Sequence, residues 1–115
     1  MAEPTVLEIA AECTTKETAL DGKRYSCRSD WSTLKAPPGH VFIKDDLEVN
    51  WTSKSGSENS YAVQWDDEVE VIPGTGIELP TTMQVQVRAR SPKGPASGRG
   101  WSKAKFVVPI TKYRP

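Results

Sequence analysis

The clearest pattern in the chain is the alternation of apolar and polar residues between Thr82 and Arg90. Alternation with a period of two is typical of a strand that is buried on one face and solvated on the other. A helix would instead repeat its apolar positions every three to four residues. The same alternation predicts further strands over residues 41–51 (kinked at Asp45–Asp46), 61–71 and 101–110.

Residues 5–13 fit two patterns. Every second residue from Leu7 to Cys13 is apolar, as in a strand, whereas the apolar positions from Val6 onward also fit one face of a short helix that begins near Pro4. The strand is favoured because threonines and an Asp-Gly turn signal follow closely. A short N-terminal helix remains the alternative.

Polar and glycine-rich segments separate the predicted strands. The chain has nine prolines and eight glycines, which divide it into short pieces as in an all-β protein. Loops are expected at residues 53–60 and 91–100, and a turn at Pro73–Gly76. Five or six short strands predict one antiparallel β-sandwich domain over residues 1–115, with a sandwich-like core in 36–110 and an N-terminal hairpin extension in 1–35. The expected core contains Val49, Trp51, Val63, Trp65, Val85, Val87 and Phe106.

The two cysteines are predicted to be free. Asp21-Gly22 is a strong signal for a two-residue hairpin. In that hairpin Cys13 and Cys27 would lie on opposite sides of the ribbon, where their sulfurs cannot meet. Residues 1–10 contain no basic region followed by an apolar run, so no signal peptide is expected. Both observations favour a cytoplasmic location.

Several segments resemble the fibronectin type III family. The similar segments are Ala36–Gly39 (APPG), Leu47–Trp51 (LEVNW), Tyr61–Trp65 (YAVQW), Pro80–Arg90 (PTTMQVQVRAR) and the loop Ser91–Gly100 with Trp101-Ser102 after it. Together they cover about residues 36–108. The resemblance implies an immunoglobulin- or fibronectin-like sandwich of two sheets, with a binding or spacer role and no catalysis.

Charge is divided unevenly along the chain. All 15 acidic residues lie at or before Glu78, so residues 1–78 carry a net charge of −8 and residues 79–115 one of +8. The basic segment, with an aromatic at its edge, predicts a surface that binds a protein or an anionic ligand. The alternative, which the zero total charge favours, is that the two segments lie side by side and that these cations pair with Glu48, Asp66, Glu68 and Glu70 on acidic strands. The candidate binding residues are Arg88, Arg90, Lys93, Arg99, Trp101 and Lys103.

Other functions have less support in the sequence. Nucleic acid is a less favoured partner because the total charge is zero, and no apolar run is long enough to cross a membrane. A metal site and a cofactor are not expected, because a single histidine and two distant cysteines cannot complete a zinc site and no phosphate-binding loop is present. A lectin-like sandwich that stacks Trp31 or Trp101 on a sugar is one alternative. A small enzyme using His40 near a carboxylate or Cys27 is another, although the chain is expected not to be an enzyme.

Overall fold

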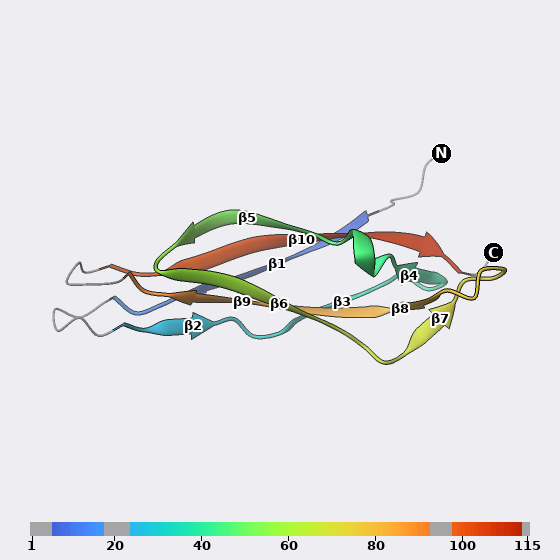
Figure 1. The fold of residues 1–115 in the computed structure, drawn as a ribbon, viewed down its shortest axis with the longest axis horizontal. Helices are drawn as coiled ribbons and strands as arrows, with labels where there is room; N and C mark the ends of the chain where they lie inside the picture. Colours follow the sequence, from blue (N-terminus) through green and yellow to red (C-terminus); the bar gives the residue numbers. More distant parts are fainter. Residues whose placement is uncertain (1–5, 18–23, 93–97, 114–115) are drawn as a thin grey trace.

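The computed structural model describes residues 6–17, 24–92 and 98–113, and the regular secondary structure in this part of the chain is almost entirely β-strand (Figure 1). Its only helical element is the 3₁₀ turn η1. Every paired strand runs antiparallel to its neighbour. The elements are β1 (Val6–Thr14), β2 (Ser26–Arg28), β3 (Ser32–Lys35), β4 (His40–Phe42), η1 (Lys44–Asp46), β5 (Glu48–Ser55), β6 (Glu58–Trp65), β7 (Val69–Val71), β8 (Glu78–Pro80), β9 (Thr82–Arg90) and β10 (Trp101–Lys112).

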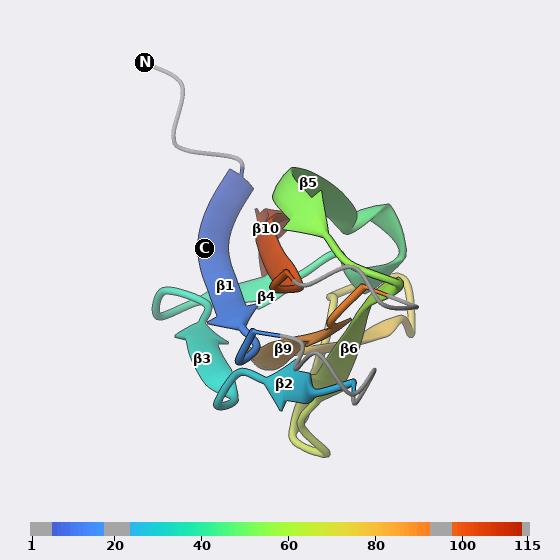
Figure 2. The same ribbon diagram turned by 90° about the vertical axis from the view of Figure 1, so that its left-hand side faces the viewer.

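The strands form two layers, each organised by one long strand. In one sheet β9 lies between β6 on one side and the successive short strands β2 and β3 on the other. In the other sheet β10 pairs with β1 and β5, and its C-terminal end pairs with β4. Seen end-on, the two sheets face each other (Figure 2). The predicted all-β antiparallel sandwich is confirmed.

The core lies between the two central strands. Alternate residues of β9 and β10 point into it and exclude water almost completely, which is the main source of stability for such a fold. Of the predicted core residues, Val85, Val87 and Phe106 are fully buried. The other four, Val49, Trp51, Val63 and Trp65, are half-buried and pack against this cluster.

The order of the strands differs from that of an immunoglobulin domain. In that fold the last two strands lie in the same sheet. Here the consecutive strands β9 and β10 are the central strands of opposite sheets. The segments 80–90 and 101–108, which resemble neighbouring strands of the fibronectin family, therefore face each other across the core.

The N-terminal third of the chain belongs to both sheets. Residues 6–14 form the predicted strand and not a helix, and this strand, β1, completes the sheet of β10. The strands β2 and β3 pair instead with β9. The expected hairpin between β1 and β2 is therefore not formed, and its Asp21-Gly22 turn lies outside the described residues.

Two expected features of the middle of the chain are wrong. The segment 41–51 is not one kinked strand, because η1 divides it into β4 and β5. The segment 53–60 is not a loop, because β5 continues to Ser55 and β6 begins at Glu58. Both strands remain paired although they are polar there, since β10 and β9 supply their backbone hydrogen-bond partners; the register of β5 with β10 shifts at Thr52.

The segment after Trp65 also departs from its pattern. Val69 and Val71 were expected to continue the buried face of the preceding strand, but both are exposed. They belong to β7, which pairs only with β8 in a separate two-stranded sheet around the predicted Pro73–Gly76 turn. After the break at Asp66–Glu68 the chain therefore leaves the sheet of β9, and its valines are exposed to solvent instead of facing the core.

One residue on the predicted solvent face of β9 is buried. Gln86 has only 3% of its surface exposed because the segment after β2 covers it, and its amide donates a 3.0 Å hydrogen bond to the carbonyl of Ser29.

Within the described residues, no helix has the length and apolar character needed to cross a membrane.

Candidate anion-binding face

Three arginines project from the outer face of the sheet around β9. Val87 and Ala89 point into the core, so the alternation of the strand turns Arg88 and Arg90 toward solvent. Arg28 on β2 lies directly opposite Arg88 in the antiparallel register. Because opposed residues share a face, all three guanidinium groups emerge on the same side of the sheet.

Small residues beside these arginines leave a shallow hollow. Ser60 on β6 is opposite Arg88, and Ser26 on β2 is opposite Arg90. Their short side chains do not fill the space between the long ones, and the hollow has a volume of about 570 Å³. We call this surface the arginine face; it is lined by Ser26, Cys27, Arg28, Glu58, Ser60, Arg88, Ala89 and Arg90.

Positive charge on the arginine face is only partly neutralised. Arg90 Nη1 lies 3.6 Å from Glu58 Oε1, and both side chains are largely exposed, so this ion pair is weak. Among the described residues Arg28 and Arg88 form no ion pair. These two like charges are directly opposite each other on neighbouring strands, an arrangement that lowers the stability of a sheet. The face therefore has two guanidinium groups available for an anion.

Hydrogen bonds from the opposite sheet and the β5–β6 turn fix the backbone under this face. The Ser102 hydroxyl on β10 donates a 2.6 Å hydrogen bond to the carbonyl of Arg88. The backbone N–H of Ser57 donates one of 3.0 Å to the carbonyl of Arg90. Both carbonyls are thus satisfied by groups outside β9, which keeps the end of the strand in one position.

Two glycines allow this close approach. Gly56 has φ of +113°, and a Cβ there would overlap the carbonyl oxygen of Arg90. A Cβ on Gly100 would overlap the same oxygen. Only residues without a side chain fit against Arg90 from these two segments, so the glycines help to position the arginine face.

A disulfide ties the arginine face to the opposite sheet. Cys13 on β1 and Cys27 on β2 are bonded, with their Cα atoms 5.9 Å apart. The prediction of free thiols is wrong because it assumed that the two segments pair as one ribbon. They lie in facing sheets, and both side chains point toward the interior. Cys27 immediately precedes Arg28, so the bond anchors the strand that carries this arginine.

The structure does not bring all predicted binding residues together. Trp101 and Lys103 lie on β10 and project from the outer face of the other sheet, where the Trp101 indole N–H donates a 2.8 Å hydrogen bond to Ser53 Oγ. Arg99 is exposed just before β10. Lys93 lies outside the described residues. Only Arg88 and Arg90 of the predicted set belong to the arginine face.

The lysines of β10 are paired across the strands. Lys103 Nζ lies 3.9 Å from Glu12, and Lys105 Nζ lies 3.8 Å from Glu8, both on β1. The predicted internal pairing therefore occurs for part of the basic segment, with β1 glutamates and Glu58 as partners. The expected partners Glu48, Asp66, Glu68 and Glu70 form no ion pair within the described residues. Glu48 lies on β5 opposite Val107 of β10, and the other three lie outside the strands that border β9 and β10.

His40 and Cys27, one of the pairs considered for a catalytic site, are far apart. His40 lies on β4, beside the C-terminal end of β10, with Nδ1 3.0 Å from the carbonyl oxygen of Pro38. Cys27 is opposite Ala89 near the other end of the molecule and is bonded to Cys13. Within the described residues no group of three His, Cys, Asp or Glu side chains is arranged to hold a metal ion.

Three residues that complete the arginine face, Arg28, Glu58 and Ser60, were not predicted from the sequence. Arg28 was assigned to an N-terminal hairpin, and Glu58 with Ser60 to a loop. Their role depends on β2 and β6 both pairing with β9, a long-range arrangement without a local signal. The alternation around Cys27 would have indicated that Arg28 is exposed, but not which strand it borders.

Comparison of the chain with models of known families gives no match, and neither the curated proteins nor the solved structures contain a significant match.

Proposed function

We propose that this protein is a non-catalytic binding module whose arginine face takes a ligand that carries phosphate or sulfate groups. The observation that carries the proposal is the opposed pair Arg28 and Arg88, which have no ion-pair partner among the described residues. Such a pair lowers stability unless an anion lies between the two charges. The planar guanidinium group binds phosphate-like oxyanions through two parallel hydrogen bonds.

The spacing of the charges favours a ligand with several anionic groups. Opposed residues on neighbouring strands are about 5 Å apart, and Arg88 and Arg90, which are two residues apart, are separated by about 7 Å. A flexible polyanion can match both separations. The open hollow also provides two serine hydroxyls, Ser26 and Ser60, as further hydrogen-bond donors.

We further propose that the protein works in an oxidising compartment. The cytoplasmic expectation rested in part on free cysteines, and the Cys13–Cys27 disulfide removes that support. Structural disulfides persist mainly outside the reducing cytosol. A binding role for a β-sandwich module is also what the fibronectin resemblance implies, but the proposal does not require membership of that family.

The test is a titration with two probes, short-chain inorganic polyphosphate and a dextran sulfate oligomer. We expect Arg28→Gln/Arg88→Gln to weaken binding of both by at least about tenfold, because each lost charge-assisted contact is worth about 1.5–3 kcal/mol. The slope of log affinity against log salt concentration should become shallower by about two, which is one for each arginine removed.

The matched control is Lys103→Gln/Lys105→Gln, which removes the same charge from the other outer face. We expect it to change affinity by less than about twofold, since both lysines already have glutamate partners. Equal losses in the two double variants would show unspecific attraction and contradict the proposal. Absence of binding by the unmodified protein would also contradict it.

A further inference from the structure

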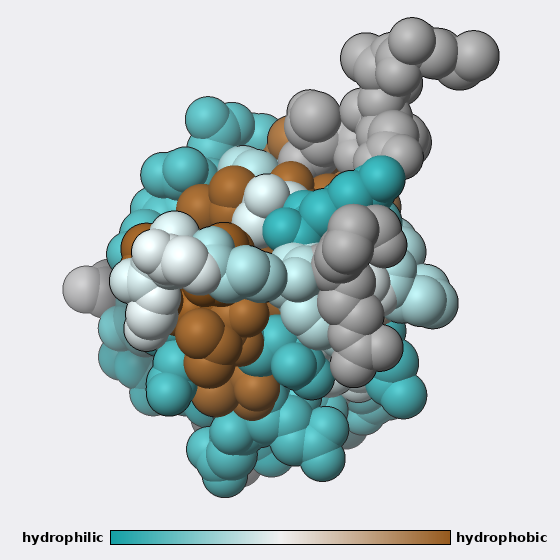
Figure 3. All heavy atoms as spheres, turned by 90° about the vertical axis from the view of Figure 1, so that its right-hand side faces the viewer, coloured by the Kyte–Doolittle hydropathy of each residue, from teal (hydrophilic) through white to brown (hydrophobic). Residues whose placement is uncertain are grey.

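The end of the molecule opposite the arginine face exposes apolar side chains. Three of the six large hydrophobic residues that are exposed in the described chain belong to the hairpin of β7 and β8: Val69, Val71 and Ile77, which are 41%, 51% and 54% exposed. The space-filling view of this end shows an apolar area bordered by hydrophilic residues (Figure 3). Clustered apolar surface of this kind marks interaction sites.

The same hairpin is acidic. Asp67, Glu68 and Glu78 are exposed, and Glu70 is half-buried. Within the described residues none of these four forms an ion pair, and no metal site is formed there. Lys35, Lys44 and Lys112 also lie toward this end, but the four carboxylates outnumber them. We call the hairpin with its preceding residues, Asp67–Glu78, the acidic end.

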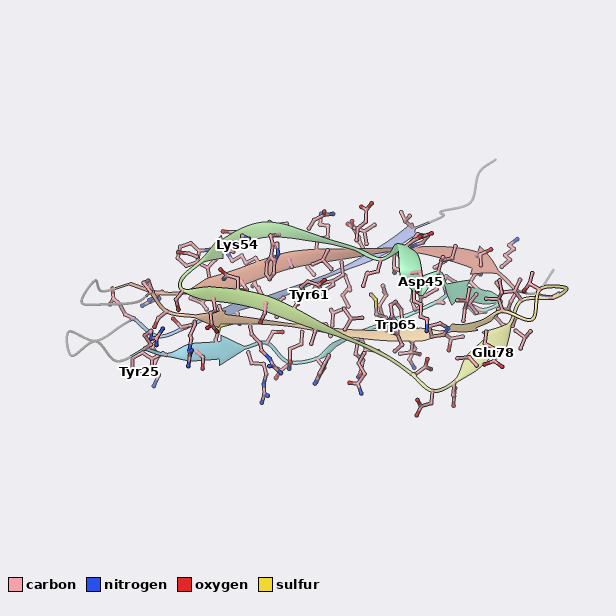
Figure 4. All side chains as sticks on the ribbon, viewed as in Figure 1. Tyr25, Asp45, Lys54, Tyr61, Trp65 and Glu78 are labelled. Atoms are coloured by element: carbon pink, nitrogen blue, oxygen red, sulfur yellow. A yellow bond between two sulfur atoms is a disulfide. The ribbon has the colours of Figure 1, made fainter. Side chains whose placement is uncertain are left out.

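The two charged regions lie at opposite ends of an elongated sandwich. The register of β6 and β9 runs from Glu58 opposite Arg90 to Trp65 opposite Met83, and the acidic end begins just beyond this second pair. In the stick view Tyr25, near the arginine face, and Glu78, in the acidic end, lie at opposite extremes (Figure 4). The charges were expected to lie side by side; this holds for Arg90, Lys103 and Lys105, which pair with glutamates, whereas the acidic end lies far from Arg28 and Arg88.

We infer that the acidic end docks on the arginine face of a second copy of this chain, head to tail. The inference rests on the proposed function, because it names one anionic partner of that face. The carboxylates of Glu68 and Glu78 would occupy the place of the oxyanions beside Arg28 and Arg88. The exposed valines and Ile77 would pack on the aliphatic stems of the arginines.

Charge disfavours a symmetric dimer in which two like ends meet. Two acidic ends, or two arginine faces, repel each other when they meet, whereas unlike ends attract. A head-to-tail contact between different surfaces leaves one surface of each kind free in every dimer. The association therefore continues into chains whose length increases with protein concentration. It weakens in salt, because exposed charges are screened over about 8 Å at physiological ionic strength.

The experiment measures the weight-average mass by sedimentation or light scattering over a range of concentrations at low ionic strength. We expect the mass of the unmodified protein to rise above that of the monomer and to return to it at about 0.5 M salt. The variants Glu68→Lys/Glu78→Lys and Arg28→Glu/Arg88→Glu should each remain monomeric, because each lacks one of the two complementary surfaces.

An equimolar mixture of the two variants should associate again. The intact arginine face of the first variant can then bind the intact acidic end of the second. Recovery on mixing also shows that both variants are folded. A mixture that stays monomeric, or unmodified protein that stays monomeric at every concentration, overturns the inference.

The polyphosphate probe separates this inference from the proposed function. Glu68→Lys/Glu78→Lys keeps the arginine face intact and should bind polyphosphate with affinity within about twofold of the unmodified protein. Saturating polyphosphate should also dissociate the chains of the unmodified protein, because it competes for the same face. If polyphosphate binds but no chains form, the inference fails and the proposed function stands. If chains form without any binding of polyphosphate, the proposed function fails in its stated chemistry.

Discussion

The two ends of the sandwich are built in opposite ways. At the arginine end polar residues are buried: Ser91 and Ser102 are fully covered, and their hydroxyls bond to the backbone of Tyr25 and Arg88. At the acidic end apolar residues are exposed, with Val71 and Ile77 more than half open to solvent. One end uses polar groups to fix its backbone, and the other leaves its apolar surface uncovered.

This difference separates the two proposed binding surfaces. The arginine end is held by a disulfide, by close glycine contacts and by hydrogen bonds between sheets, so its charges are positioned before a ligand arrives. The acidic end is a two-stranded hairpin outside the main core. Two-stranded sheets are marginally stable by themselves. We therefore expect the acidic end to gain order when it is covered.

The largest effect on stability is expected when one methyl group is added at the arginine end by Gly56→Ala. Gly56→Ala should lower the free energy of unfolding by more than about 3 kcal/mol, because its Cβ overlaps the Arg90 carbonyl at a positive φ that alanine avoids. Gly74→Ala at the acidic end shares the positive φ but has no atom within 4 Å, and should lower it by about 1 kcal/mol. Urea denaturation measures both. Equal losses of stability in the two variants would contradict the prediction that the arginine end is closely packed around Gly56 and the acidic end is open around Gly74.

Loss of the disulfide should have the next largest effect. Cys13→Ala/Cys27→Ala should lower the free energy of unfolding by about 3 kcal/mol, because the bond closes a loop across a sequence separation of 14 residues in the unfolded chain. Reduction of the unmodified protein should have a similar effect. The double variant provides the control, since a reductant should not change its denaturation curve. A curve of the unmodified protein that is the same with and without reductant would contradict this prediction.

The sequence predicted well those elements that one sheet face defines locally. The alternation in β9 and β10 follows directly from burial of one face, and Met83, Val85 and Phe106 are buried as the pattern requires. Prediction from the same pattern failed at both ends of the sandwich, once for a polar segment and once for apolar residues. The polar segment 53–60 proved to be mostly strand, while the apolar Val69 and Val71 proved to be exposed.

Long-range pairing explains both failures and the incomplete site. A polar strand is stable at Ser53–Ser55 because β10 lies beside it, and the local sequence does not contain that information. The disulfide was missed for the same reason, because β1 and β2 face each other across the core. Arg88 and Arg90 could be identified as an exposed basic pair, but the contribution of Arg28 required knowledge of which strand borders β9.

A smaller change in stability is expected to have opposite signs on the outer faces of the two sheets. Arg88→Gln should raise the free energy of unfolding by about 0.5 kcal/mol at low salt, because it removes the repulsion from Arg28. Lys105→Gln should lower it by a similar amount, because Glu8 loses its partner. Both changes should shrink in high salt, since exposed charges are screened. A loss of stability in Arg88→Gln would indicate that Arg88 is paired in solution.

The smallest effect concerns the one carboxylate of the arginine face. Glu58 lies 3.6 Å from Arg90 and competes with any anion for that guanidinium group. Glu58→Gln should therefore raise the affinity for polyphosphate by about two- to threefold, which corresponds to the roughly 0.5 kcal/mol of an exposed ion pair. Glu12→Gln, which frees Lys103 on the other outer face, is the control and should leave the affinity unchanged. Equal gains in both variants would mean that polyphosphate responds to total charge and not to the geometry around Arg28, Arg88 and Arg90.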